Sequence, residues 1–173
     1  MKYLILVLGV VFLHSCQGGS NVEPPEQNLT PAEHREALIQ QNVERLRFER
    51  EMLEAYSDSS GLDWTRTGTG LQYYIYEKGK GAKIEEEDII EMDYTLTLLD
   101  GFPVSSSAES GPFMMRVNKD NDAVLGMHEA TLLLHKGDSA AILIPSHLAW
   151  GIAGDMDKIP PITPVLYHVR IHD

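Results

Sequence analysis

The chain has 173 residues, enough for one ordinary domain of about 100–150 residues with a helical extension. It carries 14 Lys and Arg against 26 Asp and Glu, a net charge of −12, which should repel nucleic acid over most of the surface. Hydrophobic residues make up 43% and charged residues 23%, values that exclude a mostly disordered or fibrous chain. The single cysteine excludes an intramolecular disulfide and a thiolate zinc cage.

The first fifteen residues have the features of a lipoprotein signal peptide. Lys2 gives a basic start, and residues 3–13 form an apolar run that is about half the ~20 residues needed to cross a bilayer. The segment LHSC at 13–16 resembles the bacterial lipobox, in which the cysteine is lipidated after cleavage. We therefore expect 1–15 to be removed and Cys16 to anchor the chain to a cell-envelope membrane, facing the periplasm. A secreted product without lipid and an uncleaved anchor are the alternatives.

A flexible tether and a helix are expected next. Residues 17–29 are Gly, Ser, Asn, Gln, Glu and Pro with little apolar content, so the lipidated cysteine and the tether together span 16–29. Thr30-Pro31-Ala32-Glu33 has the order of an N-cap, a first-turn proline and a capping-box glutamate, which predicts a helix over 30–56. Residues 57–66 are expected to be a connector.

The predicted helix is amphipathic and should bury one stripe. At 100° per residue its apolar side chains gather on one face; they are Leu38, Ile39, Val43, Leu46, Leu53 and Tyr56. The stripe either packs against the following domain or pairs with a second copy of the chain in a homodimer. The pattern does not decide between the two.

The remaining residues, 67–173, predict an α+β domain. Ile90, Met92, Tyr94, Leu96 and Leu98 alternate with polar residues, which is typical of a half-buried strand. Similar alternation predicts strands around 71–75, 140–144 and 165–171, whereas a helical pattern occupies about 122–135. Several strands with one helix favour a curved antiparallel sheet folded over that helix.

The sequence lacks the motifs of nucleophilic, metal and nucleotide chemistry. It contains no G-x-S-x-G elbow, P-loop, dinucleotide fingerprint, H-E-x-x-H or C-x-x-C, and no pair of histidines has the spacing of helical metal ligands. We therefore expect neither a metal nor a cofactor.

Six segments in a fixed order resemble the FKBP-type peptidyl-prolyl isomerases. They are GLQYYIYEKGKG (70–81), DYTLTLLDG (93–101), GPF (111–113), VLGMHEATLLLHKGDSAAILIPSHLAWG (124–151), IPP (159–161) and VLYHVRI (165–171). The resemblance implies an FKBP-like fold over 67–173. A helix that follows a lipidated cysteine further resembles the FKBP lipoproteins of the Bacteroidota, including those associated with gliding motility.

The resemblance also implies a substrate pocket. Its walls and floor would be Tyr94, Val104, Ser105, Phe113, Val124, Met127, Trp150, Ile159 and Tyr167. By the same analogy the backbone N–H of Val124 and the indole Nε1 of Trp150 would donate to carbonyl groups of a bound proline-containing polypeptide. Such a pocket isomerises the X–Pro bond without a nucleophile, because an apolar surrounding favours the twisted amide over the more dipolar planar one.

Three departures from the family pattern predict a slower enzyme. Met127 replaces the tryptophan floor, Val104-Ser105 replaces a phenylalanine-aspartate pair, and Leu96 replaces a glycine. The expected function is therefore a prolyl isomerase that assists the folding of exported proteins. A non-catalytic chaperone or assembly module of an envelope or motility machine, and an unrelated α+β binding lipoprotein, are the alternatives.

Overall fold

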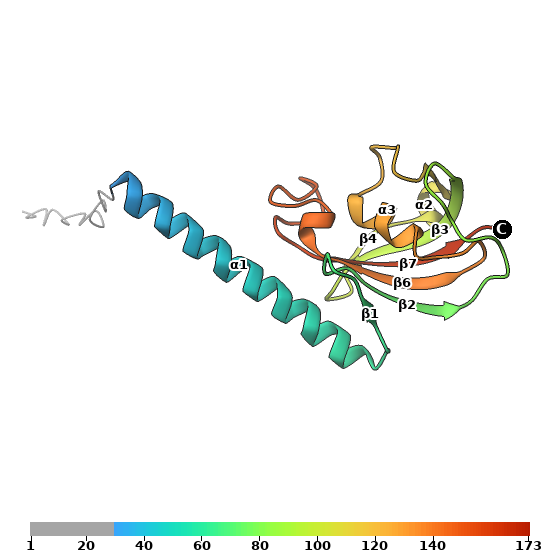
Figure 1. Ribbon diagram of the computed structural model, residues 1–173, viewed down its shortest axis with the longest axis horizontal. Helices are drawn as coiled ribbons and strands as arrows, with labels where there is room; N and C mark the ends of the chain where they lie inside the picture. The colour runs from blue at the N-terminus through green and yellow to red at the C-terminus, as the bar shows by residue number, and fades with distance from the viewer. Residues whose placement is uncertain (1–29) are drawn as a thin grey trace, which may run out of the picture.

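The computed structural model describes residues 30–173 (Figure 1). The predicted signal peptide, the lipidation site Cys16 and the tether 16–29 lie outside the described residues. The elements are α1 (Pro31–Ser60), β1 (Thr65–Arg66), β2 (Gln72–Glu77), β3 (Ile89–Leu98), β4 (Pro103–Ser106), α2 (Ser107–Ser110), β5 (Phe113–Arg116), α3 (Leu125–Thr131), β6 (Ser139–Ile144), the 3-10 helix η1 (Ser146–Leu148) and β7 (Val165–Ile171). No helix among residues 30–173 is long and apolar enough to cross a membrane.

Helix α1 begins where the sequence predicts and ends later. Thr30 and Glu33 form the capping box, with each side chain bonded to the other residue's backbone N–H. The helix continues to Ser60 and stops at Gly61, whose left-handed φ of 69° suits glycine. The expected connector 57–66 is therefore wrong at both ends, because 57–60 are helical and β1 already pairs with β2.

The apolar stripe of α1 is only partly buried. Its four N-terminal members, Leu38, Ile39, Val43 and Leu46, are 47–57% exposed. Burial begins further along the helix, where Glu49 and Leu53 are the buried residues of α1. Figure 1 shows the corresponding arrangement, with the N-terminal half of the helix extending away from the sheet. The interpretation that the whole stripe packs on the domain is wrong for that half.

The described strands form one antiparallel sheet of seven, which confirms the predicted α+β class. The strand order is β1-β2-β6-β7-β3-β4, and β5 pairs with β3. The longest pairing joins β3 to β7, from Met92 opposite Ile171 to Leu98 opposite Val165. The central strands are therefore distant in sequence, and long-range pairing brings the predicted segments together.

Both faces of the sheet are covered, and β6 shows how. Ala140, Ile142 and Ile144 belong to the main core around α3. Ala141 and Leu143 point to the other face, where they pack with Leu53 of α1, because successive side chains of a strand alternate between faces. The predicted helix 122–135 is shorter than expected, since α3 ends at Thr131 and tight turns carry the chain on to Leu134.

Candidate functional site

A cavity of about 170 Å³ opens between the sheet and α3. Strands β3, β4, β5 and β7 supply one side, and α3 with the segment before it and the loop after η1 supply the other. Its lining residues are Met92, Tyr94, Leu96, Ser105, Phe113, Asp122, Ala123, Val124, Met127, Trp150 and Tyr167. An apolar cavity of roughly 150 Å³ holds a benzene ring, so this cavity has room for the five-membered ring of proline.

Strand register explains why three aromatic rings meet here. Residues opposite one another in neighbouring strands share a face; Met92 lies opposite Phe113 and Leu96 opposite Tyr167. Tyr94, midway between Met92 and Leu96 on β3, therefore points to the same side as both partners. Its ring centroid lies 6.2 Å from that of Phe113 and 6.1 Å from that of Tyr167, within the range of favourable aromatic pairs.

Hydroxyl groups surround the exposed end of Tyr94. Its OH lies 3.2 Å from Ser110 Oγ, and Ser105 Oγ donates to it at 3.4 Å. Its backbone N–H donates to Ser107 Oγ at 3.1 Å. Burial, with a smaller contribution from Tyr94, raises the pKa of Tyr167. The phenol of Tyr167 is therefore neutral at neutral pH and can serve as a hydrogen-bonding group toward a ligand.

Helix α3 and the loop after η1 place the opposite wall. Val124 is the N-cap of α3, and Met127, almost fully buried, forms the floor one turn later. Trp150 lies between Ala149 and Gly151, whose N–H groups both donate to the carbonyl of Ser146, at 2.9 and 2.8 Å. These two hydrogen bonds to one carbonyl oxygen close a tight turn, which places Trp150 at the cavity.

Two residues expected in the pocket do not line it. Val104 is buried in the main core, while its neighbour Ser105, opposite Leu96, lines the cavity. The register with β3 shifts at this point, because Leu96 pairs with Ser105 and Thr97 with Pro103, so Val104 is the extra residue of a bulge. Ile159 is also a core residue. Asp155 Oδ1 accepts the N–H of Ile159 at 2.7 Å, and this bond folds the loop so that the Ile159 side chain is buried in the main core.

Four lining residues were missed: Met92, Leu96, Asp122 and Ala123. The alternation of β3 contained the signal for the first two, because they share a face with Tyr94. Asp122 and Ala123 had no such signal, since the sequence pattern begins a helix at Asp122, whereas in the structure the chain bends at 121–123 and the helix begins only after the N-cap Val124.

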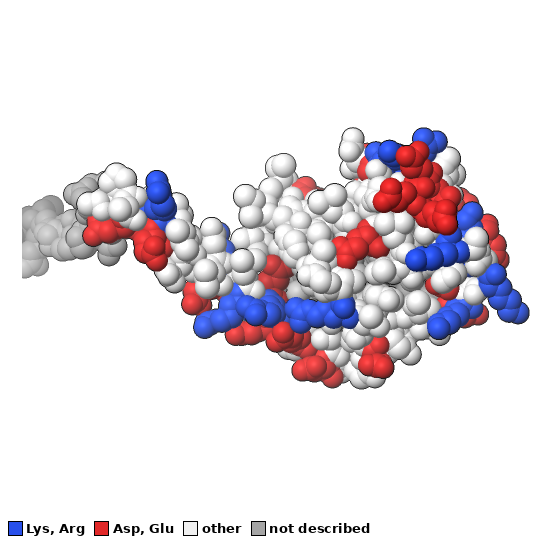
Figure 2. Space-filling view, viewed as in Figure 1, with Lys and Arg blue, Asp and Glu red and all other residues white. Residues whose placement is uncertain are grey.

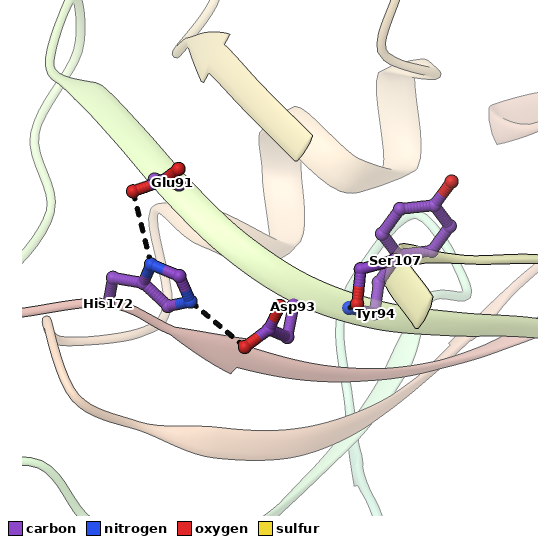
Figure 3. Close-up of polar contacts among 5 residues, drawn as sticks. All are labelled: Glu91, Asp93, Tyr94, Ser107 and His172. Carbon is purple, nitrogen blue, oxygen red and sulfur yellow. Dashed lines mark hydrogen bonds and ion pairs between the residues drawn. The ribbon is translucent and has the colours of Figure 1, made fainter. Parts of the chain in front are cut away.

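A second cluster of titratable groups lies on the other side of β3. His172 Nδ1 is 3.1 Å from Glu91 Oε2, and its Nε2 is 3.0 Å from Asp93 Oδ2. Figure 3 shows the imidazole between the two carboxylates, with Tyr94 pointing away from them. The hydrogen bonds to Asp93 and Glu91 raise the pKa of His172. No group of three or more His, Cys, Asp or Glu within 30–173 is arranged to hold a metal ion.

The fold and the cavity together define a class of protein with a small, aromatic-lined cavity between a curved sheet and a short helix. Comparison with known proteins agrees with this class. Residues 80–172 match the family model described as FKBP-type peptidyl-prolyl cis-trans isomerase. The chain belongs to this FKBP family.

Relatives differ in how much of their length the chain covers. A probable FKBP-type isomerase FkpA from Neisseria meningitidis is 34% identical over 106 residues, 61% of this chain but 38% of the relative. The macrophage infectivity potentiator of Trypanosoma cruzi is 30% identical over 172 residues, 98% of this chain and 81% of the relative. FkpA from Escherichia coli K12 is 30% identical, but the match spans only 44% of its length.

Solved structures show the same fold. The crystal structure of FkpA from Escherichia coli aligns with a TM-score of 0.65 over 84% of this chain and 73% of that one, at 24% identity. A peptidyl-prolyl cis-trans isomerase from Pseudomonas syringae aligns with a TM-score of 0.63 over 75% and 92%, at 23% identity.

Proposed function

We propose that the chain catalyses cis–trans isomerisation of X–Pro bonds in exported polypeptides and that the cavity is its active site. The observation that carries this proposal is the convergence of predicted site residues from separate segments on one hollow. These residues are Tyr94, Ser105, Phe113, Val124, Met127, Trp150 and Tyr167. Family membership supports the same reaction.

The proposed chemistry requires only that amide resonance be weakened. Resonance gives the C–N bond a rotation barrier of about 18–20 kcal/mol, and uncatalysed isomerisation takes tens of seconds or longer. The planar amide is more dipolar than the twisted transition state, so an aromatic, water-poor cavity favours the twisted form. Each ~1.4 kcal/mol of such preference gives a tenfold rate increase.

Two donors are proposed to hold the substrate backbone beside the ring. The N–H of Val124 lies at the N-terminal end of α3, and the indole of Trp150 borders the cavity from the opposite loop. An indole N–H donates only, which suits a substrate carbonyl. Met127 and Ser105 in the lining replace larger or charged family residues, so we expect catalysis below that of a family member with the full pattern.

A protease-coupled assay on an X–Pro peptide tests this function. We expect turnover by the full chain and at least a tenfold lower kcat/KM for Tyr94→Ala and for Trp150→Ala. Tyr76→Ala, a change of an exposed tyrosine outside the cavity, is the matched control and should match the unmodified chain. Equal rates for all four proteins and for the uncatalysed reaction would refute the proposal.

A peptide-clamping chaperone is the second candidate, favoured by exposed apolar side chains that are close in sequence to cavity residues. Leu125 follows the lining residue Val124 and is mostly exposed, while Ile152 and Met156, in the loop after Trp150, are 84% and 92% exposed. Figure 2 shows acids and bases gathered along α1 and at the far end of the domain, with a largely uncharged surface between them. Loss of turnover with retained suppression of aggregation in Tyr94→Ala would favour this role.

We further propose that the protein works as a lipoprotein on the periplasmic side of a cell-envelope membrane, anchored by Cys16. The lipobox resemblance and the length of the tether support this location. A role in gliding motility remains a prediction from the family resemblance alone. Metabolic labelling with a fatty acid should mark the full chain and fail to mark Cys16→Ser. Equal labelling of both would refute the anchor.

Pairing of two copies through α1 is proposed for the exposed half of the stripe. Leu38, Ile39, Val43 and Leu46 form an unpaired apolar row on a projecting helix, and such a row is stabilised by burial against a second copy. Sedimentation of the chain without its signal peptide should give a dimer, and Ile39→Lys with Val43→Lys should give a monomer. A monomer in both cases would exclude pairing.

A further inference from the structure

Glu49 is a buried acid on a helix that is otherwise mostly exposed up to that point. It is 4% exposed, and within residues 30–173 it forms no ion pair with Lys, Arg or His. A buried carboxylate without a cation is costly unless hydrogen bonds satisfy it. Both of its oxygens are engaged by one residue, Ser146: the backbone N–H donates to Oε1, and Oγ donates to Oε2 at 2.9 Å.

Ser146 in turn controls the backbone around Trp150. Its carbonyl accepts the N–H groups of Ala149 and Gly151, the residues on either side of Trp150. The carbonyl of Gly151 accepts the N–H of Ile162 at 2.9 Å, which ties the turn to the far end of the loop. A continuous set of hydrogen bonds therefore runs from Glu49 through Ser146 to the backbone of the two residues that flank Trp150.

The position of Glu49 in the chain makes this contact informative. Glu49 lies outside the matched family region 80–172, and 97 residues separate it from Ser146. Leu53, one turn further along α1, packs on Ala141, Leu143 and Leu166 and holds this part of the helix on the sheet. The docked end of α1 thus reaches the wall of the cavity through Glu49.

We propose that Glu49 is a positioning residue for the cavity: by clasping both donors of Ser146, it fixes the turn that places Trp150 against the substrate. This inference rests on the proposed isomerase function and deepens it. Helix α1 then belongs to the functional unit, because its docked end sets the geometry of the wall that Trp150 supplies.

Isomerase kinetics of the full chain test the inference. Glu49→Ala should lower kcat/KM about tenfold, because small misplacements at a distance reduce rates by such factors. Ser146→Ala, which keeps the backbone donor and loses the hydroxyl, should give a smaller loss in the same direction. Glu51→Gln changes an exposed acid of α1 and should match the unmodified chain.

A double-mutant cycle separates positioning from a general loss of structure. If Glu49 acts through Trp150, Glu49→Ala should change nothing further in a Trp150→Ala background. Additive effects in that background, or unchanged kinetics of both Glu49→Ala and Ser146→Ala, would overturn the inference. If Glu49→Ala does not fold, Ser146→Ala carries the same cycle.

A fluorescence readout keeps the inference independent of turnover. In a Trp64→Phe background the emission reports Trp150 alone, since the chain has two tryptophans. Acrylamide should quench Trp150 at least twofold more strongly after Glu49→Ala and to an unchanged extent after Glu51→Gln; unchanged quenching in both would overturn the inference. A full chain without turnover but with this quenching change would refute the proposed function and leave the positioning role intact.

Discussion

The two faces of the sheet use the same strands in different ways, and each carries one of the two tryptophans. On the outer face Trp64 packs in a small cluster with Leu53 and donates its Nε1–H to Ser60 Oγ at 2.8 Å. On the concave face Trp150 borders a cavity. The outer face is closed by the end of a 30-residue helix, whereas α3 has only 7 residues. A short helix leaves part of a curved face uncovered, and that part holds the cavity proposed as the binding site.

The largest expected loss of stability comes from removing a buried side chain on the concave face of the sheet. Ile142 is completely buried among the main cluster, so Ile142→Ala should lower the free energy of unfolding by about 4 kcal/mol through lost transfer energy and a cavity. Urea unfolding measures the difference. A loss below about 1 kcal/mol would show that this face is loosely packed.

The outer face should be less sensitive. Leu53→Ala also removes a buried side chain, but the cluster around it is small and lies under a single helix, so we expect a loss of about 2 kcal/mol. Leu46→Ala, on the exposed part of the same stripe, should stay within about 0.5 kcal/mol. Equal losses for the two leucines would mean that both ends of α1 are docked in solution.

Alternation along strands made much of this arrangement predictable. The alternation in β3 predicted that Tyr94 lies on the inner face, and the family resemblance predicted that Phe113, Trp150 and Tyr167 line the same cavity. The pattern could not show that β6 is buried on both faces, because Ala141 and Leu143 are covered by a helix distant in sequence. Nor could it place Ile159, whose burial depends on a local turn around Asp155, or the contact between Glu49 and Ser146, which depends on tertiary docking.

A smaller effect is expected at the contact between α3 and η1. A Cβ at Gly126 would lie 2.3 Å from Ile144 Cγ2 and 3.2 Å from the carbonyl oxygen of Leu148. Overpacking of this kind costs about 1–3 kcal/mol, against about 1 kcal/mol gained in helix propensity, so Gly126→Ala should lose about 1 kcal/mol net. Gly68→Ala, with open space at its Cβ, is the control. Thermal unfolding that ranks the two variants the other way would contradict the contact.

The smallest effect belongs to the His172 cluster and depends on pH. Hydrogen bonds to Asp93 and Glu91 raise the pKa of His172 above 6.5, and the bond from His172 lowers the pKa of Asp93 below 3.8. The contribution of His172 is therefore complete below pH 6.5 and lost as pH rises through the raised pKa, while that of Asp93 is present above pH 3.8.

Thermal unfolding at two pH values measures this contribution. His172→Gln should lower the Tm slightly at pH 5.5 and leave it unchanged at pH 9, because the imidazole is neutral at the higher pH. Tyr94 points away from this cluster (Figure 3), so isomerase activity should respond little. A larger Tm loss at pH 9 than at pH 5.5 would contradict the assigned ion pairs.

The two tryptophans allow one direct measurement of the account's main claim. In an NMR titration of the ¹⁵N-labelled chain, a proline-containing peptide should shift the indole Nε1–H resonance of Trp150 and leave that of Trp64 in place. The same peptide with alanine in place of proline should shift neither. A proline peptide that leaves Trp150 unmoved, or moves only Trp64, would contradict the assignment of the cavity as the binding site for proline.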